Sequence, residues 1–112
     1  MPRIRQAKGR RHVRGRMNKT EAEYERLFLG GKAHGYEEIT LRLGDDCRLT
    51  IDFWMLADDD VLEFHEVKGF WRDDAKVKLR VAAERYPHFR FRAFRKDKTG
   101  WHVEHFGPED AP

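Results

Sequence analysis

The chain has 112 residues, of which 39% are apolar and 12% aromatic, so it can fill the core of one modest domain. Its single cysteine, Cys47, excludes an internal disulfide, and no apolar run reaches the ~18 residues of a membrane-spanning helix. The basic N-terminus lacks the apolar core of a secretion signal. We therefore expect a cytoplasmic protein that does not associate with membranes.

The net charge of +3 conceals two parts of opposite sign. Residues 1–16 contain seven Lys and Arg residues and no acid, so the rest of the chain carries −4. Dense like charge with few apolar residues predicts that residues 1–17 form a basic, disordered arm. We expect this arm to bind nucleic-acid phosphates, through Arg10, Arg11, Arg14 and Arg16. A solubilising leader, or an arm packed on the acidic body or on a partner subunit, is the alternative.

A stripe of apolar residues at helical spacing predicts the first helix, over residues 18–29. Two capping boxes compete at its start, Asn18 with Glu21 and Thr20 with Glu23, because each places a cap residue three positions before a glutamate. In the first case Glu21 serves as a cap. In the second case Glu21 is released from that duty.

Alternating and apolar runs predict three strands after this helix, over residues 36–43, 48–56 and 61–68. A second helix is expected over residues 74–86, followed by strands over 87–95 and 101–106. Asp73 can cap the second helix, and Pro87 prevents its continuation. The strand–helix–strand unit over 61–95 favours a right-handed parallel crossover. We expect an α/β domain over 18–107, a small mixed β-sheet flanked by helices, and a loose tail over 108–112.

The strands over 48–56 and 61–68 flank an acidic turn, and their register determines which charges meet. With the turn centred at Asp59, facing residues have numbers that sum to 118. Asp52 then faces Glu66, and Thr50 faces Lys68. Glu66 and Lys68 are two residues apart and share a sheet face. This register gathers two carboxylates and an ammonium at one end of a hairpin.

Three charges in an otherwise apolar hairpin require an explanation. A solvated ion pair on an exposed face is one, because such pairs are common and contribute little to stability. However, the same face carries Trp54, Leu56, Leu62 and Phe64, which predicts at least partial burial. A buried carboxylate pair with one lysine repels itself unless a cation binds. Mg²⁺ binds through one or two carboxylates together with phosphate oxygens and water.

The sequence resembles the PD-(D/E)XK nuclease superfamily in Ile51-Asp52-Phe53 and Glu66-Val67-Lys68, with thirteen residues between Asp52 and Glu66 and with Ile51 where the family usually has Pro. Its continuation is similar to the phage endonuclease I group of Holliday junction resolvases in Gly69-Phe70-Trp71, Asp73-Asp74, a basic helix and Tyr86-Pro87. Asn18-Lys19-Thr20-Glu21 resembles an upstream segment of small phage nucleases of this superfamily. The resemblance covers about residues 18–96.

The resemblance implies a restriction-endonuclease-like nuclease core and a metal-binding hydrolase active on DNA. Mg²⁺, or Mn²⁺ in its place, would be held by Asp52, Glu66 and the backbone carbonyl of Val67. Glu21 would complete the acidic cluster, with Glu23 or Glu25 as alternatives. Lys68 would position the attacking water or stabilise the phosphate. Gly69, which has no side chain, would let a phosphate backbone approach.

The resemblance also implies partners and a setting. The substrate would be DNA, including the four-way junctions of DNA recombination, and Lys19, Lys76 and Lys78 would contact its phosphates. Because two strands are cut and one chain offers one site, a homodimer is expected. The setting would be the bacterial host cytoplasm of a phage-encoded enzyme. A non-catalytic nucleic-acid-binding module, a nonspecific nickase or duplex nuclease, and an RNA-acting relative are the alternatives.

Overall fold

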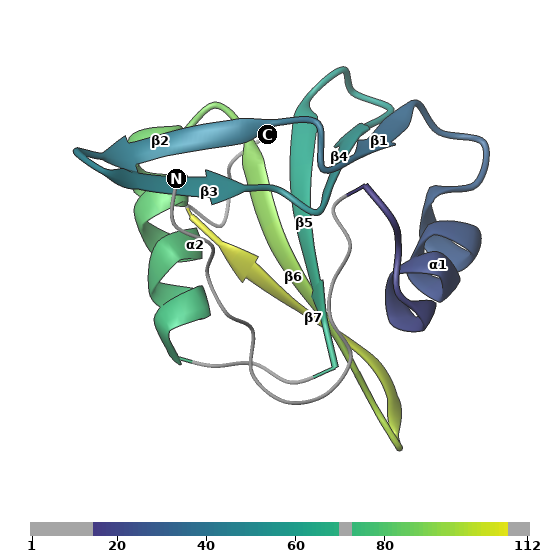
Figure 1. The fold of residues 1–112 in the computed structure, drawn as a ribbon. Helices are drawn as coiled ribbons and strands as arrows, with labels where there is room; N and C mark the ends of the chain where they lie inside the picture. Colours follow the sequence, from purple (N-terminus) through teal and green to yellow (C-terminus); the bar gives the residue numbers. More distant parts are fainter. Residues whose placement is uncertain (1–14, 70–72, 108–112) are drawn as a thin grey trace.

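The computed structural model describes residues 15–69 and 73–107 (Figure 1). The predictions for Arg10, Arg11 and Arg14 and for the tail over 108–112 fall outside these residues. In the part of the chain that is described, no helix is long and apolar enough to cross a membrane.

A mixed five-stranded sheet forms the centre of the molecule, with strand order β1-β4-β5-β6-β7. Its strands are β1 (His34–Tyr36), β4 (Phe53–Leu56), β5 (Leu62–Lys68), β6 (Arg90–Asp97) and β7 (Gly100–Phe106). β5 and β6 are parallel and are connected through α2 (Asp73–Arg85), whereas the other neighbours are antiparallel. The parallel strand–helix–strand connection expected from the sequence is therefore present.

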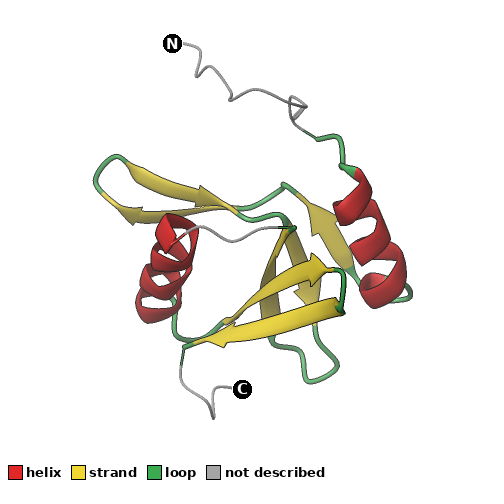
Figure 2. Cartoon of the chain, turned by 90° about the horizontal axis from the view of Figure 1, so that it is seen from below, coloured by secondary structure: helices red, strands yellow, loops and turns green. Residues whose placement is uncertain are grey.

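The two faces of this sheet are covered by different elements (Figures 1 and 2). One face packs against α2 and a two-stranded sheet made of β2 (Thr40–Gly44) and β3 (Cys47–Thr50). The other face packs against α1 (Lys19–Tyr24) and the π-helical turn η1 (Glu25–Leu29) that continues it. The protein is thus an α/β domain, and its core is divided into two apolar clusters by the central sheet.

The register predicted for the central hairpin is confirmed. Phe53 pairs with His65, Trp54 with Phe64, and Leu56 with Leu62, so facing numbers sum to 118 throughout the β4–β5 ladder. Trp54 and Phe64 both belong to the cluster under α2, so this face is covered near Glu66 rather than exposed. An exposed, fully solvated ion pair is therefore excluded for the hairpin.

The prediction of one continuous strand over 36–43 and another over 48–56 is wrong. Each is interrupted and forms two strands, and the two interruptions lie opposite each other. Glu37 has a left-handed backbone conformation (φ 51°), which ends β1 before β2 begins. Across from it, residues 51 and 52 separate β3 from β4, and the Ile51 N–H donates to the Ile39 carbonyl at 2.9 Å. Thr50 consequently pairs with Thr40 in the smaller sheet instead of facing Lys68.

The remaining boundaries differ from the predictions by a few residues. α2 begins at Asp73 itself, so the position expected to cap it already belongs to the helix. β6 begins at Arg90 rather than at residue 87, because the Phe89 N–H donates to the Tyr86 carbonyl in a turn after α2. β7 extends one residue further towards the turn than expected.

Candidate functional site

Asp52 and Glu66 meet where the ladder between β4 and β5 ends. The last ladder pair is Phe53 with His65. Beyond it, the Asp52 N–H donates to the Glu66 carboxylate at 3.0 Å, and the Val67 N–H donates to the Asp52 carboxylate at 2.9 Å. Both acids are buried, with exposed fractions of 7% and 6%. At this point two hydrogen bonds from backbone amides to carboxylates take the place of backbone pairing between the strands. They hold the carboxylates of Asp52 and Glu66 next to each other.

A cavity of about 350 Å³ lies beside this pair, at the end of β5. It is lined by Asn18, Thr20, Glu21, Glu37, Asp52, Val67, Lys68 and Gly69. Glu66 is not part of the lining, and it is connected to the cavity through Asp52, whose backbone N–H donates to its carboxylate. Three of the four predicted catalytic side chains and the predicted Val67 backbone position therefore border one space.

Glu21 reaches this cavity from the first turn of α1 and is 4% exposed. It forms the capping box with Asn18, in which the Glu21 N–H donates to Asn18 Oδ1 at 2.8 Å and the Asn18 N–H donates to Glu21 Oε1 at 3.0 Å. The Tyr36 hydroxyl donates to the same Glu21 oxygen at 2.8 Å. Of the two capping boxes, the structure selects Asn18 with Glu21, and capping does not remove Glu21 from the cavity.

The two alternatives to Glu21 are engaged elsewhere. Glu23 forms an ion pair with Lys96 at 2.5 Å and accepts a hydrogen bond from the Trp101 ring at 3.1 Å. Glu25 forms an ion pair with His34 at 2.9 Å. Neither lines the cavity, so Glu21 is the glutamate of the first helix that accompanies Asp52.

The electrostatics of the site follow from burial and mutual repulsion. Burial raises the pKa of Asp52 above its usual value, and the nearby Lys68 only partly opposes this. Burial, and then the Asp52 charge, raise the pKa of Glu66. Burial acts to lower the pKa of Lys68, but Asp52, Glu66 and Glu21 outweigh it and the pKa is raised. The carboxylates are thus destabilised in their charged form, while Lys68 is held as an ammonium.

The donor set determines which cofactor the site could hold. Among the described residues, no three or more His, Cys, Asp or Glu side chains are grouped to hold a metal ion. Asp52 and Glu66 each use one carboxylate oxygen for a backbone amide, and the other oxygen accepts no hydrogen bond from the described residues. Two hard oxygen donors of this kind fit Mg²⁺, which completes its shell with carbonyl, water and phosphate oxygens.

The predicted phosphate-binding residues lie in two places. Arg16 and Lys19 are exposed, and Lys19 lies between Asn18 and Thr20, which line the cavity. Lys78 is exposed on α2. Lys76 is half-buried and forms an ion pair with Glu104 at 3.2 Å, so its charge is partly neutralised by β7. Arg16, Lys19 and Lys78 remain the stronger candidates for contacts with a polyanion.

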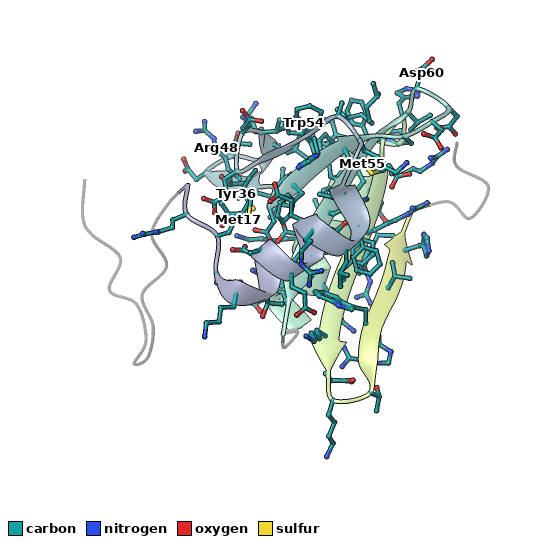
Figure 3. The ribbon with its side chains drawn as sticks, turned by 90° about the vertical axis from the view of Figure 1, so that its right-hand side faces the viewer. Met17, Tyr36, Arg48, Trp54, Met55 and Asp60 are labelled. Atoms are coloured by element: carbon teal, nitrogen blue, oxygen red, sulfur yellow. The ribbon has the colours of Figure 1, made fainter. Side chains whose placement is uncertain are left out.

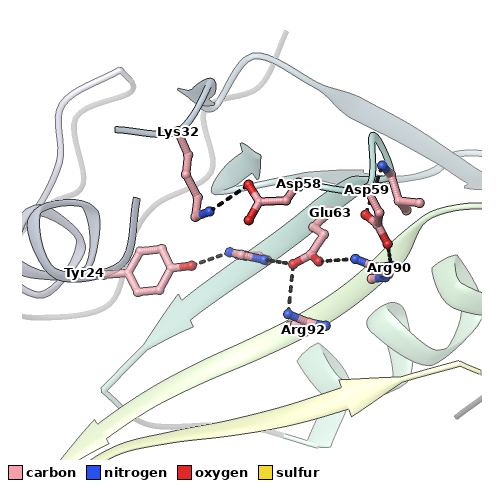
Figure 4. A network of polar contacts seen from close by, with 9 residues as sticks. Tyr24, Lys32, Asp58, Asp59, Glu63, Arg90 and Arg92 are labelled. Atoms are coloured by element: carbon pink, nitrogen blue, oxygen red, sulfur yellow. Dashed lines mark hydrogen bonds and ion pairs between the residues drawn. The ribbon is translucent and has the colours of Figure 1, made fainter. Parts of the chain in front are cut away.

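A buried polar network on the other sheet face was missed by the sequence prediction (Figure 4). His65 is 2% exposed and forms hydrogen bonds with Glu63 at 2.9 Å and with the Tyr24 hydroxyl. Glu63 also pairs with Arg90 at 2.8 Å and Arg92 at 3.0 Å. The sequence did contain a signal, because Glu63 and His65 are two residues apart, as are Arg90 and Arg92. This spacing becomes informative only once the register of the two parallel strands is known.

The α1 side of the cavity contains residues that the sequence did not indicate. Tyr36 ends β1, and its ring packs against Phe53 at 5.1 Å, which holds its hydroxyl at Glu21. Met17 packs against the same cluster, as Figure 3 shows from the α1 side. Glu37 follows Tyr36, lines the cavity, and accepts a 2.7 Å hydrogen bond from the Gly15 N–H. No periodic pattern marks these residues, since Met17 precedes α1, and Tyr36 and Glu37 lie where β1 ends.

Comparison of the chain with protein-family models, curated proteins and solved structures found no match. The site is distinguished by its residues and their geometry. Asp52 lines the cavity together with Lys68, which is held as an ammonium, and with Glu21, and Asp52 is hydrogen-bonded through its backbone to the buried Glu66.

Proposed function

We propose that this protein is a divalent-metal-dependent endonuclease of the PD-(D/E)XK type that hydrolyses DNA phosphodiester bonds, with branched DNA as its preferred substrate. The observation that carries the proposal is the pairing of Asp52 with Glu66 beside Lys68 at the 350 Å³ cavity. Like-charged groups are rarely buried together without a functional reason. An ammonium close to buried acids fits a site that hydrolyses phosphate esters better than it fits a purely structural ion pair.

The fold gives a second line of support. α1, the antiparallel strands that lead to β5, and the parallel β5–α2–β6 unit place Asp52, Glu66 and Lys68 at one end of the central sheet. This is the arrangement that the sequence resemblance implies for a nuclease core. The same arrangement brings the first turn of α1, with Glu21, to the cavity.

Asp52 and Glu66 would hold Mg²⁺, with the Val67 carbonyl as a further ligand and Glu21 beside them. A bound divalent ion at such a site polarises a phosphoryl oxygen and makes a bound water more acidic. It would also relieve the repulsion that raises the pKa of both carboxyl groups. Two protein carboxylates leave coordination positions for water and substrate, which suits a catalytic site rather than a structural one.

The remaining steps belong to residues of the chain. Lys68, as an ammonium, donates to a phosphate oxygen and stabilises the negative charge that develops there during attack by water. Gly69 borders the cavity, and a methyl group at its α-carbon would meet no atom within 4 Å, so a phosphate backbone can approach. Arg16, Lys19 and the basic arm would bind flanking phosphates, which gives affinity without reading sequence.

The test is cleavage by the purified full-length protein. Four-way junction, linear duplex, single-stranded DNA and RNA are each incubated with Mg²⁺, Mn²⁺ or EDTA. Metal-dependent cutting is expected, strongest on the junction, and it should be lost in Asp52→Asn. Asp58→Asn is the matched control, because Asp58 is a fully exposed aspartate of the neighbouring turn. Equal cutting of duplex and junction would remove the junction preference, and RNA cutting would change the substrate class.

A non-catalytic nucleic-acid-binding module is the second candidate. It is favoured by one observation, that Asp52, Glu66 and Glu21 each already accept a backbone hydrogen bond. Such bonds can stabilise buried acids without any metal. Binding of the same four nucleic acids with no cutting in either metal would select this module and overturn the nuclease.

A further inference from the structure

β7 is the last strand of the central sheet, and no strand of the described chain pairs with its outer edge. Its residues from His102 to His105 are all exposed, and Val103 has 49% of its surface exposed. An open edge of this length is a template for pairing with another chain. The edge at the opposite end, β1, has only three residues.

The backbone groups available at this edge follow from the hairpin register. The β6–β7 turn has two residues and closes at the pair of Asp97 with Gly100. Hydrogen-bonded pairs then recur at every second position along the ladder. The N–H and C=O groups of Trp101, Val103 and His105 therefore point away from β6, towards the outer edge.

We propose that β7 pairs with β7 of a second copy of this chain, antiparallel, around a two-fold axis at Val103. This register matches all three outward-facing residues, because Trp101 lies opposite His105 of the partner subunit and Val103 lies opposite its own equivalent. Two hydrogen bonds at each matched pair give about six between the chains. The interface does not depend on the nuclease proposal.

Complementarity between polar side chains favours this register and this occupant. Around Val103, Glu104 lies opposite His102 of the partner subunit, and this pair occurs twice at the positions where facing side chains are closest. His102 uses only Nε2 for Asp97 and Thr99, so its Nδ1 is open to a second contact. Glu104 pairs with Lys76 of its own chain at 3.2 Å but keeps 46% of its side chain exposed, so it can also contact His102 of the partner subunit. A register centred on Glu104 would set two like charges opposite each other, which is destabilising.

An apolar surface beside the edge also fits a second copy. Val103 lies on the α1 side of the sheet, where Leu27 and Phe28 are 50% and 39% exposed. The Phe28 ring packs on Trp101 at 5.5 Å, so this surface is continuous with β7. Figure 3 shows α1 and the β6–β7 hairpin side by side from this direction. Pairing at the edge would bury Val103 against its equivalent.

Analytical ultracentrifugation of the full chain over a concentration series tests the proposal. A reversible dimer is expected, and Val103→Pro should raise its Kd at least about tenfold. Proline is tolerated on an edge strand when the N–H that it removes faces outward, so the β6–β7 ladder stays intact. Val103→Arg should also dissociate the dimer. Val77→Arg, at a valine of similar exposure (51%) on α2, should not.

Cross-linking tests the register itself. In a Cys47→Ser background, Val103→Cys places one thiol on the two-fold axis opposite its equivalent, at about 5.5 Å between α-carbons. This lies within the disulfide range, so mild oxidation should give a covalent dimer. Val77→Cys should stay monomeric under the same conditions. A monomeric wild type at all concentrations, or a Val103→Pro variant that dimerises normally, would overturn the proposal without affecting the cleavage result.

Discussion

The backbone amide of Asp52 donates a 3.0 Å hydrogen bond to the carboxylate of Glu66, in place of the next rung of the β4–β5 ladder. The bond draws a second acid towards Asp52, although both side chains are buried. Like charges so placed oppose folding, as the raised pKa of each carboxyl group indicates. The site therefore lowers the stability of the metal-free protein in a way that a ligand can reverse.

Glu66→Gln should make the metal-free protein more stable while abolishing cleavage. Gln keeps an oxygen to accept the Asp52 N–H but removes the charge that Asp52 opposes. In EDTA, at a pH above the raised pKa of Glu66 of about 8, we expect the free energy of unfolding to rise by about 1 kcal/mol. Urea denaturation measures this change. Added Mg²⁺ should raise the Tm of the wild type and leave that of the variant unchanged, while cleavage is lost.

The control for this substitution is Glu84→Gln, an exposed glutamate of α2. It should change neither the stability in EDTA nor the response to Mg²⁺. A Glu66→Gln protein less stable than the wild type in EDTA would mean that the carboxylate pair is not under electrostatic strain.

Much of this site was predictable because two strong local signals agree. The acidic turn at 57–60 lies between two apolar runs, and it sets the register that brings Asp52 to Glu66. The i, i+2 spacing of Glu66 and Lys68 then places both on one face. The helix start was less certain, since Asn18 and Thr20 offered equivalent caps. In the structure Asn18 is the cap, and its partner Glu21 also accepts a hydrogen bond from Tyr36, a contact that the local sequence does not reveal.

Two features were not predictable from local pattern. The apolar alternation continues through residues 47–56 with no Gly or Pro, so nothing marks the break at which the chain passes from β3 to β4. Glu63 is an acid within a strand, where a solvent-facing position is the ordinary expectation. Its partners Arg90 and Arg92 are more than twenty-five residues away along the chain, so they become visible only in the parallel β5–β6 register.

Lys68→Ala should abolish cleavage while the protein stays folded. The ammonium borders the cavity, and it is the cation whose charge opposes the raised pKa of both Asp52 and Glu66. Without it, the charge developing on phosphate is not neutralised, and a loss of about 10²-fold or more is expected. Single-turnover cleavage measures the rate, and circular dichroism checks folding. Lys98→Ala, at an exposed turn residue, is the control, and turnover retained in Lys68→Ala would remove Lys68 from the mechanism.

Glu63 should make the protein sensitive to acid. Burial acts against its charge, but His65, Arg90 and Arg92 outweigh this and lower the pKa of Glu63 to about 2. Its contribution to stability is therefore complete above the ordinary glutamate pKa of about 4.3, and it is lost as the pH falls towards 2. We expect a loss of about 2 kcal/mol over this interval, measured by urea denaturation at successive pH values.

Glu63→Gln identifies the residue responsible for this loss. At neutral pH the variant should be less stable by about 3 kcal/mol, because Arg90 and Arg92 lose their shared buried partner. The difference from wild type should shrink as the pH falls. If the difference in the free energy of unfolding between the two proteins stays constant down to pH about 2, the pKa of Glu63 is not lowered in the folded protein.

Gly69→Ala tests access to the cavity. The added methyl group would meet no atom within 4 Å, and Gly69 lacks a left-handed φ, so stability should change by less than about 0.5 kcal/mol. If a phosphate backbone passes over Gly69, the methyl group occupies part of its path and KM should rise. Gly44→Ala is the control, since its α-carbon also faces open space but lies in β2. Unchanged KM would place the substrate elsewhere.

Removal of the basic arm should flatten the salt dependence of DNA binding. Deleting residues 1–14 removes six of the seven cations before Met17 but keeps the Gly15–Glu37 hydrogen bond. Each phosphate neutralised contributes about 0.9 to the slope of log K against log salt, so contacts from half of these cations correspond to about 3 units. Fluorescence anisotropy on a labelled duplex over a salt series measures the slope.

An arm of the same length with these six cations changed to Gln distinguishes charge from chain length. It should bind DNA as weakly as the deletion, and with the same shallow slope, because counterion release depends on charge alone. Arg16 and Lys19 remain in both proteins and are exposed, so some salt dependence should persist. A slope equal to that of the wild type in either variant would mean that the arm does not contact phosphate, and binding would then depend on the domain itself.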